Sequence, residues 1–152
     1  MARILGIDYG RKRTGVAATD PMGIVASPLA AVPTHQLEKF ILDYVANEQV
    51  STIVVGEPRQ LDGTPSESMR YIEPFVRRLR RLLPEGITVV MSDERFTSTI
   101  AHRAMIDGGM KKSDRRDKNR VDPLAATIIL NDYLNAMQMQ GGNADIKTEP
   151  EP

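Results

Sequence analysis

The most informative absence in this sequence is cysteine, of which its 152 residues contain none. Disulfide bonds, thiolate metal sites and cysteine nucleophiles are therefore excluded, and a cytoplasmic location is expected. No apolar run approaches the roughly 20 residues that a membrane-spanning helix needs. Residues 1–10 also lack the apolar stretch and cleavage site of a signal peptide, because a strand-like run ends there at the charged Asp8.

The sequence also lacks an excess of charge of either sign, since 20 basic residues balance 20 acidic ones. A uniformly basic nucleic-acid binder is therefore not expected. The cations are instead concentrated in three clusters, at residues 11–13, 77–81 and 111–120. Such clusters can bind phosphates, but a run of charges is more often a solvated face. The sequence leaves both interpretations open.

Histidine is scarce, with two residues in the whole chain. His35 and His102 are far apart in the sequence, and neither has a second metal-ligating residue nearby. No serine stands in the context of a nucleophile elbow. A histidine metal site and a hydrolytic triad are therefore not expected.

The hydrophobic pattern indicates one α/β domain, because the chain has the length for a single core. Tight turns near residues 10 and 21 separate three short apolar runs, which predicts an antiparallel meander. Two later runs are apolar and short, as strands within a parallel sheet are. The five predicted strands are residues 3–8, 14–19, 24–32, 52–56 and 87–91.

Segments between and after these strands carry apolar residues at helical spacing, which predicts helices there. Thr34 and Thr64 are expected as N-caps of the first two helices, and Pro74 is expected to kink or interrupt the second. Asp122 is expected as the N-cap of the last helix, with Pro123 at its first position. The predicted helices are residues 34–49, 64–83, 97–107 and 122–138.

The order of these elements predicts a five-stranded mixed sheet, with three antiparallel and two parallel strands and helices on both faces. Strand 3–8 is expected at the centre, between strand 14–19 and the parallel strand 52–56, with 87–92 beyond. Residues 1–138 are therefore expected to form the domain. Residues 139–152 are rich in Gly, Asp, Glu and Pro, which predicts a disordered tail.

Acidic residues stand at three comparable places in this arrangement. Asp8 ends the first strand, Asp93 and Glu94 follow the last strand, and Asp122 starts the final helix. All can fall at the same edge of one sheet, where ligands of α/β sheets bind. Carboxylates crowded together repel one another without a cation, and Mg²⁺ or Mn²⁺ prefers carboxylate oxygens. The pattern therefore predicts a two-metal site for phosphodiester hydrolysis, with only one of the two adjacent acids pointing into it.

Each acidic residue also has a simpler interpretation. Asp122 could be only a helix N-cap, Asp8 could cap the turn over Gly10, and the two acids after the last strand could pair with Arg95. A glycine-containing turn after the first strand also opens the actin-like and sugar-kinase ATPases, where it handles ATP phosphates. Those proteins need two lobes and typically more than double this length.

Four segments, in this order and spacing, resemble the YqgF/RuvX family: GIDYGRKRTGVAATD, IVVGEPRQLDGT, SDERFTS and KNRVDPLAATIILNDYL. The resemblance covers about residues 3–135. The family is described as Holliday-junction-resolvase-like nucleases and as endonucleases that mature the 5′ end of pre-16S rRNA. Its ribonuclease H-like fold agrees with the strand and helix order predicted above.

Matched motif by motif, the resemblance implies that Asp8, Glu94 and Asp122 are the catalytic carboxylates and the metal ligands. It implies a role in substrate binding for three cations: Lys12, Arg95 and Lys118. The sequence departs from the family pattern at residues 57–60, where Glu57 replaces an apolar residue. This departure bears on substrate preference rather than on the reaction.

The sequence therefore predicts an Mg²⁺- or Mn²⁺-dependent endonuclease acting on structured nucleic acid. Pre-rRNA is the favoured substrate, with ribosomal assembly particles as further partners, and branched DNA in the form of four-way junctions is the alternative. A non-catalytic assembly factor could keep the fold, but it would gain nothing from carboxylates that face phosphates. The basic run 110–120 is expected to be either a mobile clamp on the substrate or a solvated linker.

Overall fold

The computed structural model describes residues 2–58, 67–93 and 118–147, with side chains in the last range for residues 123–138. Five strands form one mixed sheet in the order β3-β2-β1-β4-β5. Their bounds are β1 (Arg3–Asp8), β2 (Arg13–Thr19), β3 (Ala26–Pro33), β4 (Val50–Glu57) and β5 (Thr88–Asp93). The predicted sheet, with β1 at its centre, is confirmed.

The pairing explains how the carboxyl ends of three strands meet. β1 runs antiparallel to β2 and parallel to β4, and β4 runs parallel to β5. Because β1, β4 and β5 point the same way, all three end at one edge of the sheet. We call this the carboxyl edge.

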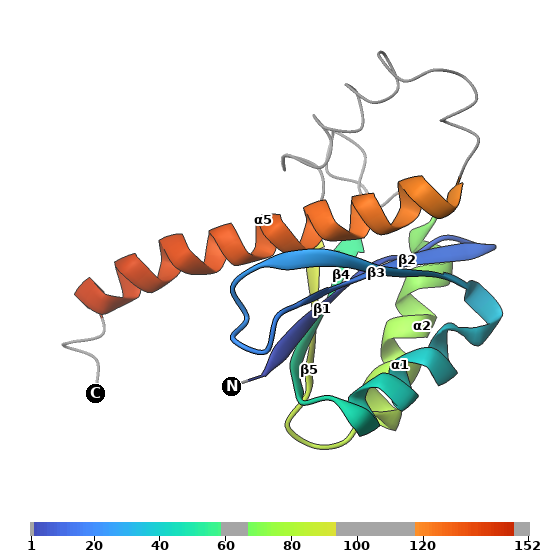
Figure 1. Ribbon diagram of the computed structural model, residues 1–152, viewed down its shortest axis with the longest axis horizontal. Coiled ribbons are helices and arrows are strands. Elements are labelled where there is room, and N and C mark those ends of the chain that lie inside the picture. Colours follow the sequence, from blue (N-terminus) through green and yellow to red (C-terminus); the bar gives the residue numbers. More distant parts are fainter. Residues whose placement is uncertain (1, 59–66, 94–117, 148–152) are drawn as a thin grey trace, which may run out of the picture.

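Helices cover both faces of the sheet (Figure 1). A short 3₁₀ turn, η1 (Thr34–Gln36), leads into α1 (Leu37–Asn47), which lies on one face beside α2 (Met69–Leu82). The opposite face is covered by α5 (Lys118–Lys147). No helix in the described part of the chain is long and apolar enough to cross a membrane.

Alternation along the strands divides the buried side chains into two clusters, one on each face. Leu5 and Ile7 of β1 belong to the cluster under α1 and α2. Ile4 belongs to the other cluster, under α5, where it joins three helical residues that repeat on one face. These are Ala126, Ile129 and Leu130.

Close packing of α5 on the sheet depends on Gly6 of β1. A Cβ atom built on Gly6 would lie 2.9 Å from both the carbonyl oxygen of Ala126 and the Cβ of Leu130. Only a residue without a side chain therefore lets the helix approach the strand this closely. The position of α5 along β1 is fixed by this contact.

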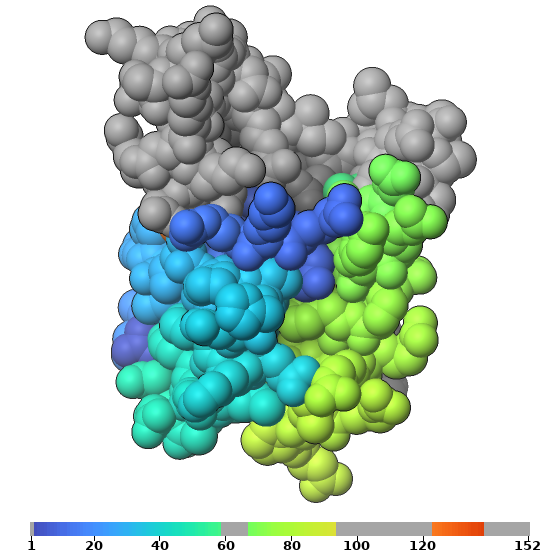
Figure 2. Space-filling model, turned by 90° about the vertical axis from the view of Figure 1, so that its right-hand side faces the viewer, coloured from blue at the N-terminus to red at the C-terminus, as the bar shows by residue number. Residues whose placement is uncertain are grey.

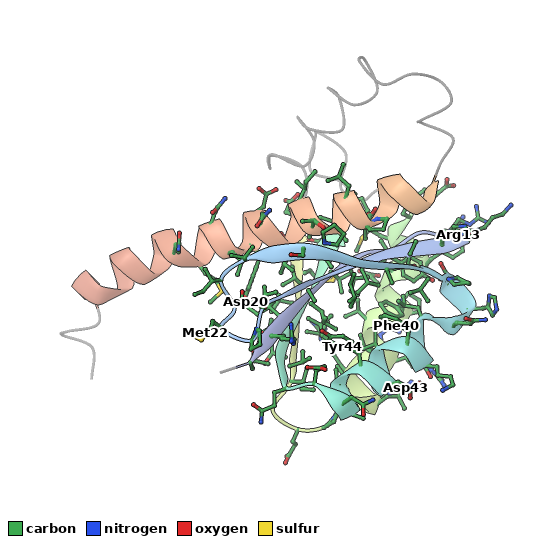
Figure 3. The ribbon with its side chains drawn as sticks, in the orientation of Figure 1. Arg13, Asp20, Met22, Phe40, Asp43 and Tyr44 are labelled. Atoms are coloured by element: carbon green, nitrogen blue, oxygen red, sulfur yellow. The ribbon has the colours of Figure 1, made fainter. Side chains whose placement is uncertain are left out.

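The ends of several elements differ from the sequence-based predictions. β3 starts at Ala26 rather than at residue 24, because the Asp20 carboxylate accepts hydrogen bonds from the backbone N–H groups of Met22, Ile24 and Val25. These bonds hold residues 20–25 in a turn at the end of β2 opposite Arg13 (Figure 3).

The helix ends differ as well. Thr34 does not cap α1; it starts the 3₁₀ turn, and the N-cap position of α1 is occupied by Gln36. Helix α2 continues through Pro74 instead of being interrupted there. The expected N-cap Thr64 and the expected helix 97–107 lie outside the described residues.

The largest correction concerns α5, which runs from Lys118 to Lys147 rather than from Asp122 to Gln138. Asp122 is therefore not an N-cap and Pro123 is not the first helical residue. The helix continues through residues 139–147, which were expected as part of a disordered tail. The domain boundary at residue 138 remains a prediction, and the helix crosses it.

Candidate active site at the carboxyl edge

Asp8, the last residue of β1, lies half-buried at the carboxyl edge. Its neighbour Ile7 faces α1 and α2, and alternation therefore places Asp8 on the opposite face, under α5. Its backbone is held in register with Gly15 of β2. The carboxylate thus projects from the end of the central strand of the sheet.

Asp122 belongs to the end of α5 that lies at this same edge (Figure 1). It precedes Ala126, the residue that contacts Gly6, by about one helical turn of 5.4 Å. Asp8 follows Gly6 by two strand residues, or about 6.6 Å. The backbones of Asp8 and Asp122 therefore reach a similar height on the same face of the sheet.

Asp93, the last residue of β5, lies on the other face. Val89 packs in the cluster under α1 and α2, and Met91 packs against that cluster. Asp93 continues this alternation and is in register with Glu57 of β4. Glu57 lines a cavity of about 250 Å³ together with Arg77 of α2, which confirms the face. Asp93 is therefore separated from Asp8 by the sheet, and Glu94, the alternative acid, lies outside the described residues.

The loop after Asp8, residues 9–13, is held by a ring of three hydrogen bonds. The N–H of Gly10 donates to Thr14 Oγ1 over 3.4 Å, and the Thr34 hydroxyl donates to the carbonyl of Gly10 over 2.6 Å. The hydroxyls of Thr14 and Thr34 lie 3.0 Å apart and close the ring. Thr34 N–H also donates to the carbonyl of Lys12 over 2.9 Å. We call residues 9–13 the first loop.

This ring has two consequences for the site. A Cβ on Gly10 would collide with the carbonyl oxygen of Arg13, so the tight path of the loop requires glycine. Lys12, an expected substrate-binding residue, is exposed at the tip of a loop whose backbone is fixed on both sides. Sequence reasoning missed Thr14 and misassigned Thr34, because no local pattern shows that residues so far apart will meet.

The first loop also packs against α2 through aromatic rings. Tyr9 lies with its ring centroid 5.1 Å from that of Phe75, and burial raises the pKa of the Tyr9 hydroxyl. The guanidinium of Arg11 lies over the ring of Tyr71, 4.7 Å from its centroid. The loop is therefore fixed to β2 and η1 on one side and to α2 on the other.

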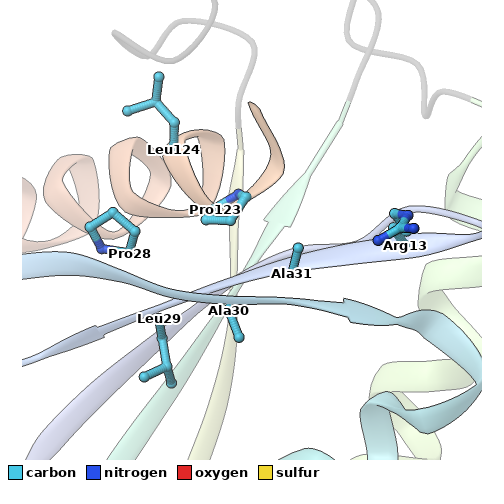
Figure 4. A pocket seen from close by; sticks show the side chains of 7 residues that line it. All are labelled: Arg13, Pro28, Leu29, Ala30, Ala31, Pro123 and Leu124. Carbon is cyan, nitrogen blue, oxygen red and sulfur yellow. The ribbon is translucent and has the colours of Figure 1, made fainter. Parts of the chain in front are cut away.

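An open groove of about 690 Å³ lies beside the site on the α5 face. Its walls are β3 and the start of the described part of α5, with Pro123 above the strand and Arg13 at one end (Figure 4). Apolar side chains line most of it, among them Pro28, Leu29 and Leu124.

The remaining predicted site residues can be placed only in part. Lys118 is the first residue of α5, at the carboxyl edge. Arg95 and the basic residues 111–116 lie outside the described residues. Among the side chains that the structure describes, no three His, Asp or Glu residues form a group that could hold a metal ion.

The sequence matches the family described as "Holliday junction resolvase" (RuvX) over residues 2–136. The chain belongs to the RuvX family. The fold agrees with this assignment, because the five-stranded mixed sheet with helices on both faces is that of the ribonuclease H-like RuvX proteins.

RuvX relatives align with the chain over almost their whole length. A protein of Phocaeicola vulgatus is 57% identical over 136 residues, which covers 90% of this chain and 97% of the relative. A protein of Bacteroides fragilis is 51% identical, covering 91% of this chain and 100% of the relative. A protein of Flavobacterium johnsoniae is 48% identical, with 90% and 98% covered. Each is named "Putative pre-16S rRNA nuclease".

Proposed function

We propose that this RuvX protein is a divalent-metal-dependent endonuclease that matures the 5′ end of pre-16S rRNA in the cytoplasm, with Asp8, Glu94 and Asp122 as its carboxylates. The observation that carries the proposal is the placement of Asp8 and of the Asp122 backbone on one face of the sheet at the carboxyl edge. The names of relatives about half identical to this chain favour the same reaction and substrate.

Carboxylate oxygens fit Mg²⁺ or Mn²⁺, which are hard cations that prefer oxygen ligands. Asp8 would present its oxygens from a rigid strand and Asp122 from a helix docked on that strand. When bound, two such ions neutralise the charge of the bridging phosphate and provide an ionised water. This chemistry needs no histidine or cysteine, in keeping with the composition of the chain.

The third carboxylate is better assigned to Glu94 than to Asp93. Asp93 faces α2, together with Glu57, whereas Asp8 faces α5. If the alternation of β5 continued by one residue, Glu94 would turn to the face of Asp8. The described end of β5 therefore supports Glu94 as the partner of Asp8 and Asp122.

Lys12 is the cation best placed for the substrate among those described. It is exposed on the first loop directly after Asp8, and the hydrogen bonds of Thr34 fix the backbone that carries it. A cation held in this way would bind a phosphate without first ordering the loop. Lys118 and Arg95 are proposed for the same role from their positions in the sequence.

A four-way DNA junction is the second candidate substrate, favoured by the description of the matched family. Both substrates present phosphodiesters, so the choice between them concerns recognition rather than the chemistry of cleavage. The open groove beside β3 would admit a strand of either nucleic acid.

The experiment compares Asp8→Asn with Asp93→Asn, because both residues end parallel strands but lie on opposite faces of the sheet. Each purified variant and the wild type are incubated with pre-16S rRNA and with a four-way junction, with Mn²⁺ or with a chelator. We expect Asp8→Asn to abolish metal-dependent cleavage and Asp93→Asn to retain most of it. Equal loss in both variants would contradict the assignment of the site, and no cleavage by the wild type would contradict the nuclease proposal.

A further inference from the structure

All the cations of α2 are arginines, and three of them form a line along its outer face. Successive helical residues are rotated by about 100°, so Arg70, Arg77 and Arg81 fall within about 40° of one another. The buried residues of the helix, among them Ile72, Val76 and Leu79, lie on the opposite side. We call Arg70, Arg77 and Arg81 the arginine stripe.

Both arginines beside the stripe have structural partners, whereas the described residues supply no ion pair to two members of the stripe. Arg78 Nε donates to Glu38 of α1 over 2.6 Å, and Arg80 Nη2 donates to the carbonyl of Val89 over 2.9 Å. Within residues 2–58, 67–93 and 123–138, Arg77 and Arg81 form no ion pair. Among these residues, their charges are therefore not used to hold the fold together.

The balance of charge on α2 remains strongly positive. Between Met69 and Leu82 the five arginines are accompanied by one acidic residue, Glu73. Arg70 lies 3.7 Å from Glu67, but both side chains are well exposed, and such a pair contributes little. The stripe thus presents exposed cations in excess over the single acid of α2.

The stripe is continuous with the first loop at the carboxyl edge. Arg11 lies over Tyr71, whose exposed fraction is 37%, and Arg70 lies 6.0 Å from the same ring. In Figure 2 the first loop, in blue, and α2, in green, lie side by side on one face of the molecule. From Arg70 to Arg81 the helix rises about 17 Å at 1.5 Å per residue. A basic track therefore leads from Lys12 along α2, away from the proposed active site.

We propose that the arginine stripe binds the phosphate backbone of an RNA arm that extends from the carboxyl edge along α2. The inference rests on the proposed function, because that function brings RNA to the edge where the stripe begins. The planar guanidinium of arginine binds phosphate through two parallel hydrogen bonds, which lysine cannot do. Tyr71 offers an exposed ring, held by Arg11, on which an unpaired base can stack.

The contacts would serve affinity and not cleavage. None of the stripe arginines belongs to the proposed catalytic set, and the stripe lies on the α2 side of the sheet, whereas Asp8 faces α5. The stripe would thus favour long substrates with an arm next to the cleavage site over short ones that reach only the edge. Phosphate contacts of this kind fix orientation and carry little information about sequence.

The test compares the Arg77→Ser/Arg81→Ser double variant with wild type and with Lys39→Ser. Lys39 is an exposed cation of α1, paired with Asp43, and serves as the control away from the stripe. Binding of a labelled, stem-containing fragment of pre-16S rRNA is measured in chelator over a series of salt concentrations. The logarithm of the binding constant falls linearly with the logarithm of the salt concentration, with a slope of about −0.7 to −0.9 per phosphate contact. We expect this slope to be less negative by roughly 1.4–1.8 units in the double variant, because two contacts are lost. Lys39→Ser should leave the slope unchanged, and thermal melting should show that all three proteins are folded.

A second measurement locates the RNA directly. Because the sequence contains no cysteine, a photoreactive group can be attached to the thiol of Arg81→Cys alone, or of Lys39→Cys as the matched control. We expect RNA to cross-link to the group at position 81 and not to that at position 39. If a polyglutamate peptide displaced the RNA from position 81 and bound there more tightly, an acidic protein would be the partner and the proposal would be overturned.

The outcomes separate this inference from the proposed function. Wild-type cleavage together with an unchanged salt slope in the double variant would overturn the stripe alone. A reduced slope and cross-linking at position 81, without cleavage by the wild type, would overturn the nuclease proposal alone. Failure of the wild type to bind the RNA at all would overturn both.

Discussion

The hydroxyl of Thr34 donates a hydrogen bond of 2.6 Å to the carbonyl oxygen of Gly10, and so ties the turn after β3 to the loop that follows Asp8. The two residues are far apart in the sequence, but the pairing of Arg13 with Pro33 brings them together. The conformation of the first loop is therefore set by the β2–β3 hairpin as well as by β1.

Thr34→Ala should lower the free energy of unfolding by about 1 kcal/mol, the usual net contribution of a hydrogen bond, because the groups it joins are only partly buried. The Gly10 carbonyl and the Thr14 hydroxyl would each lose a partner. Thr34→Ser keeps the hydroxyl and should lose much less. Urea unfolding of both variants measures the difference. Equal losses would show that the methyl group of Thr34 matters and that its hydroxyl does not.

Divalent cations should stabilise the folded protein, because they bind only where the carboxylates are assembled. We expect Mn²⁺ to raise the melting temperature of the wild type and of Asp93→Asn, but to have little effect on Asp8→Asn. Differential scanning fluorimetry with and without the metal makes this comparison independently of any substrate. The same rise in all three proteins would exclude Asp8 as a ligand.

Gly6→Ala should weaken metal binding at the proposed site, although Gly6 is not itself a proposed ligand. The added methyl group would lie 2.9 Å from Ala126 O and Leu130 Cβ, so α5 must move away from β1. We expect a loss of about 1–3 kcal/mol in stability, as is typical of overpacked cores. Because α5 carries Asp122, the stabilisation by Mn²⁺ should shrink as well, even at temperatures where the variant is fully folded. An unaltered metal effect would show that the site does not depend on this contact.

The turn at Asp20 should loosen in acid. Hydrogen bonds from the N–H groups of Val25, Ile24 and Met22 favour the ionised carboxylate and lower its pKa, with Val25 the largest cause. Since the pKa in the folded state is below the unfolded value of about 3.9, the stabilisation is complete above that pH and is lost as the pH falls through the folded pKa. The protection factors of the amides of Met22, Ile24 and Val25, which correct for the intrinsic pH dependence of exchange, should therefore fall at low pH. In Asp20→Asn this fall should be absent, and a carboxyl that titrates at or above about 3.9 would refute the explanation.

Much of the fold could be predicted because short apolar runs and tight turns determine the strands. The order of the sheet followed from the turns near residues 10 and 21 and from right-handed crossovers. The strand that ends at Asp8 was predicted with its correct bounds. The sequence predicted that only one of Asp93 and Glu94 would point into the site, because neighbouring strand residues lie on opposite faces of a sheet. The register of β5 was needed to show that Asp93 lies on the face away from Asp8.

Other features depend on contacts that a sequence does not show. Asp122 followed by Pro123 is a typical helix start, yet α5 begins at Lys118. Thr34 is a typical N-cap, but its hydroxyl is engaged by Gly10 and Thr14 instead. The sequence shows residues 77–81 as one basic cluster. The structure divides it, because Arg78 and Arg80 bond to Glu38 and to the carbonyl of Val89, whereas Arg77 and Arg81 belong to the arginine stripe.

On the proposed function, the docking of α5 on Gly6 would also determine when the catalytic centre forms. This helix follows all five strands in the chain, so it leaves the ribosome after them. Until it docks, Ile4, Ala17 and Val54 are uncovered, and the proposed site of Asp8 and Asp122 cannot form. On the proposed function, a nascent chain surrounded by ribosomal RNA would thus be harmless to it. The last helix to be made would complete the core and the catalytic centre in a single event.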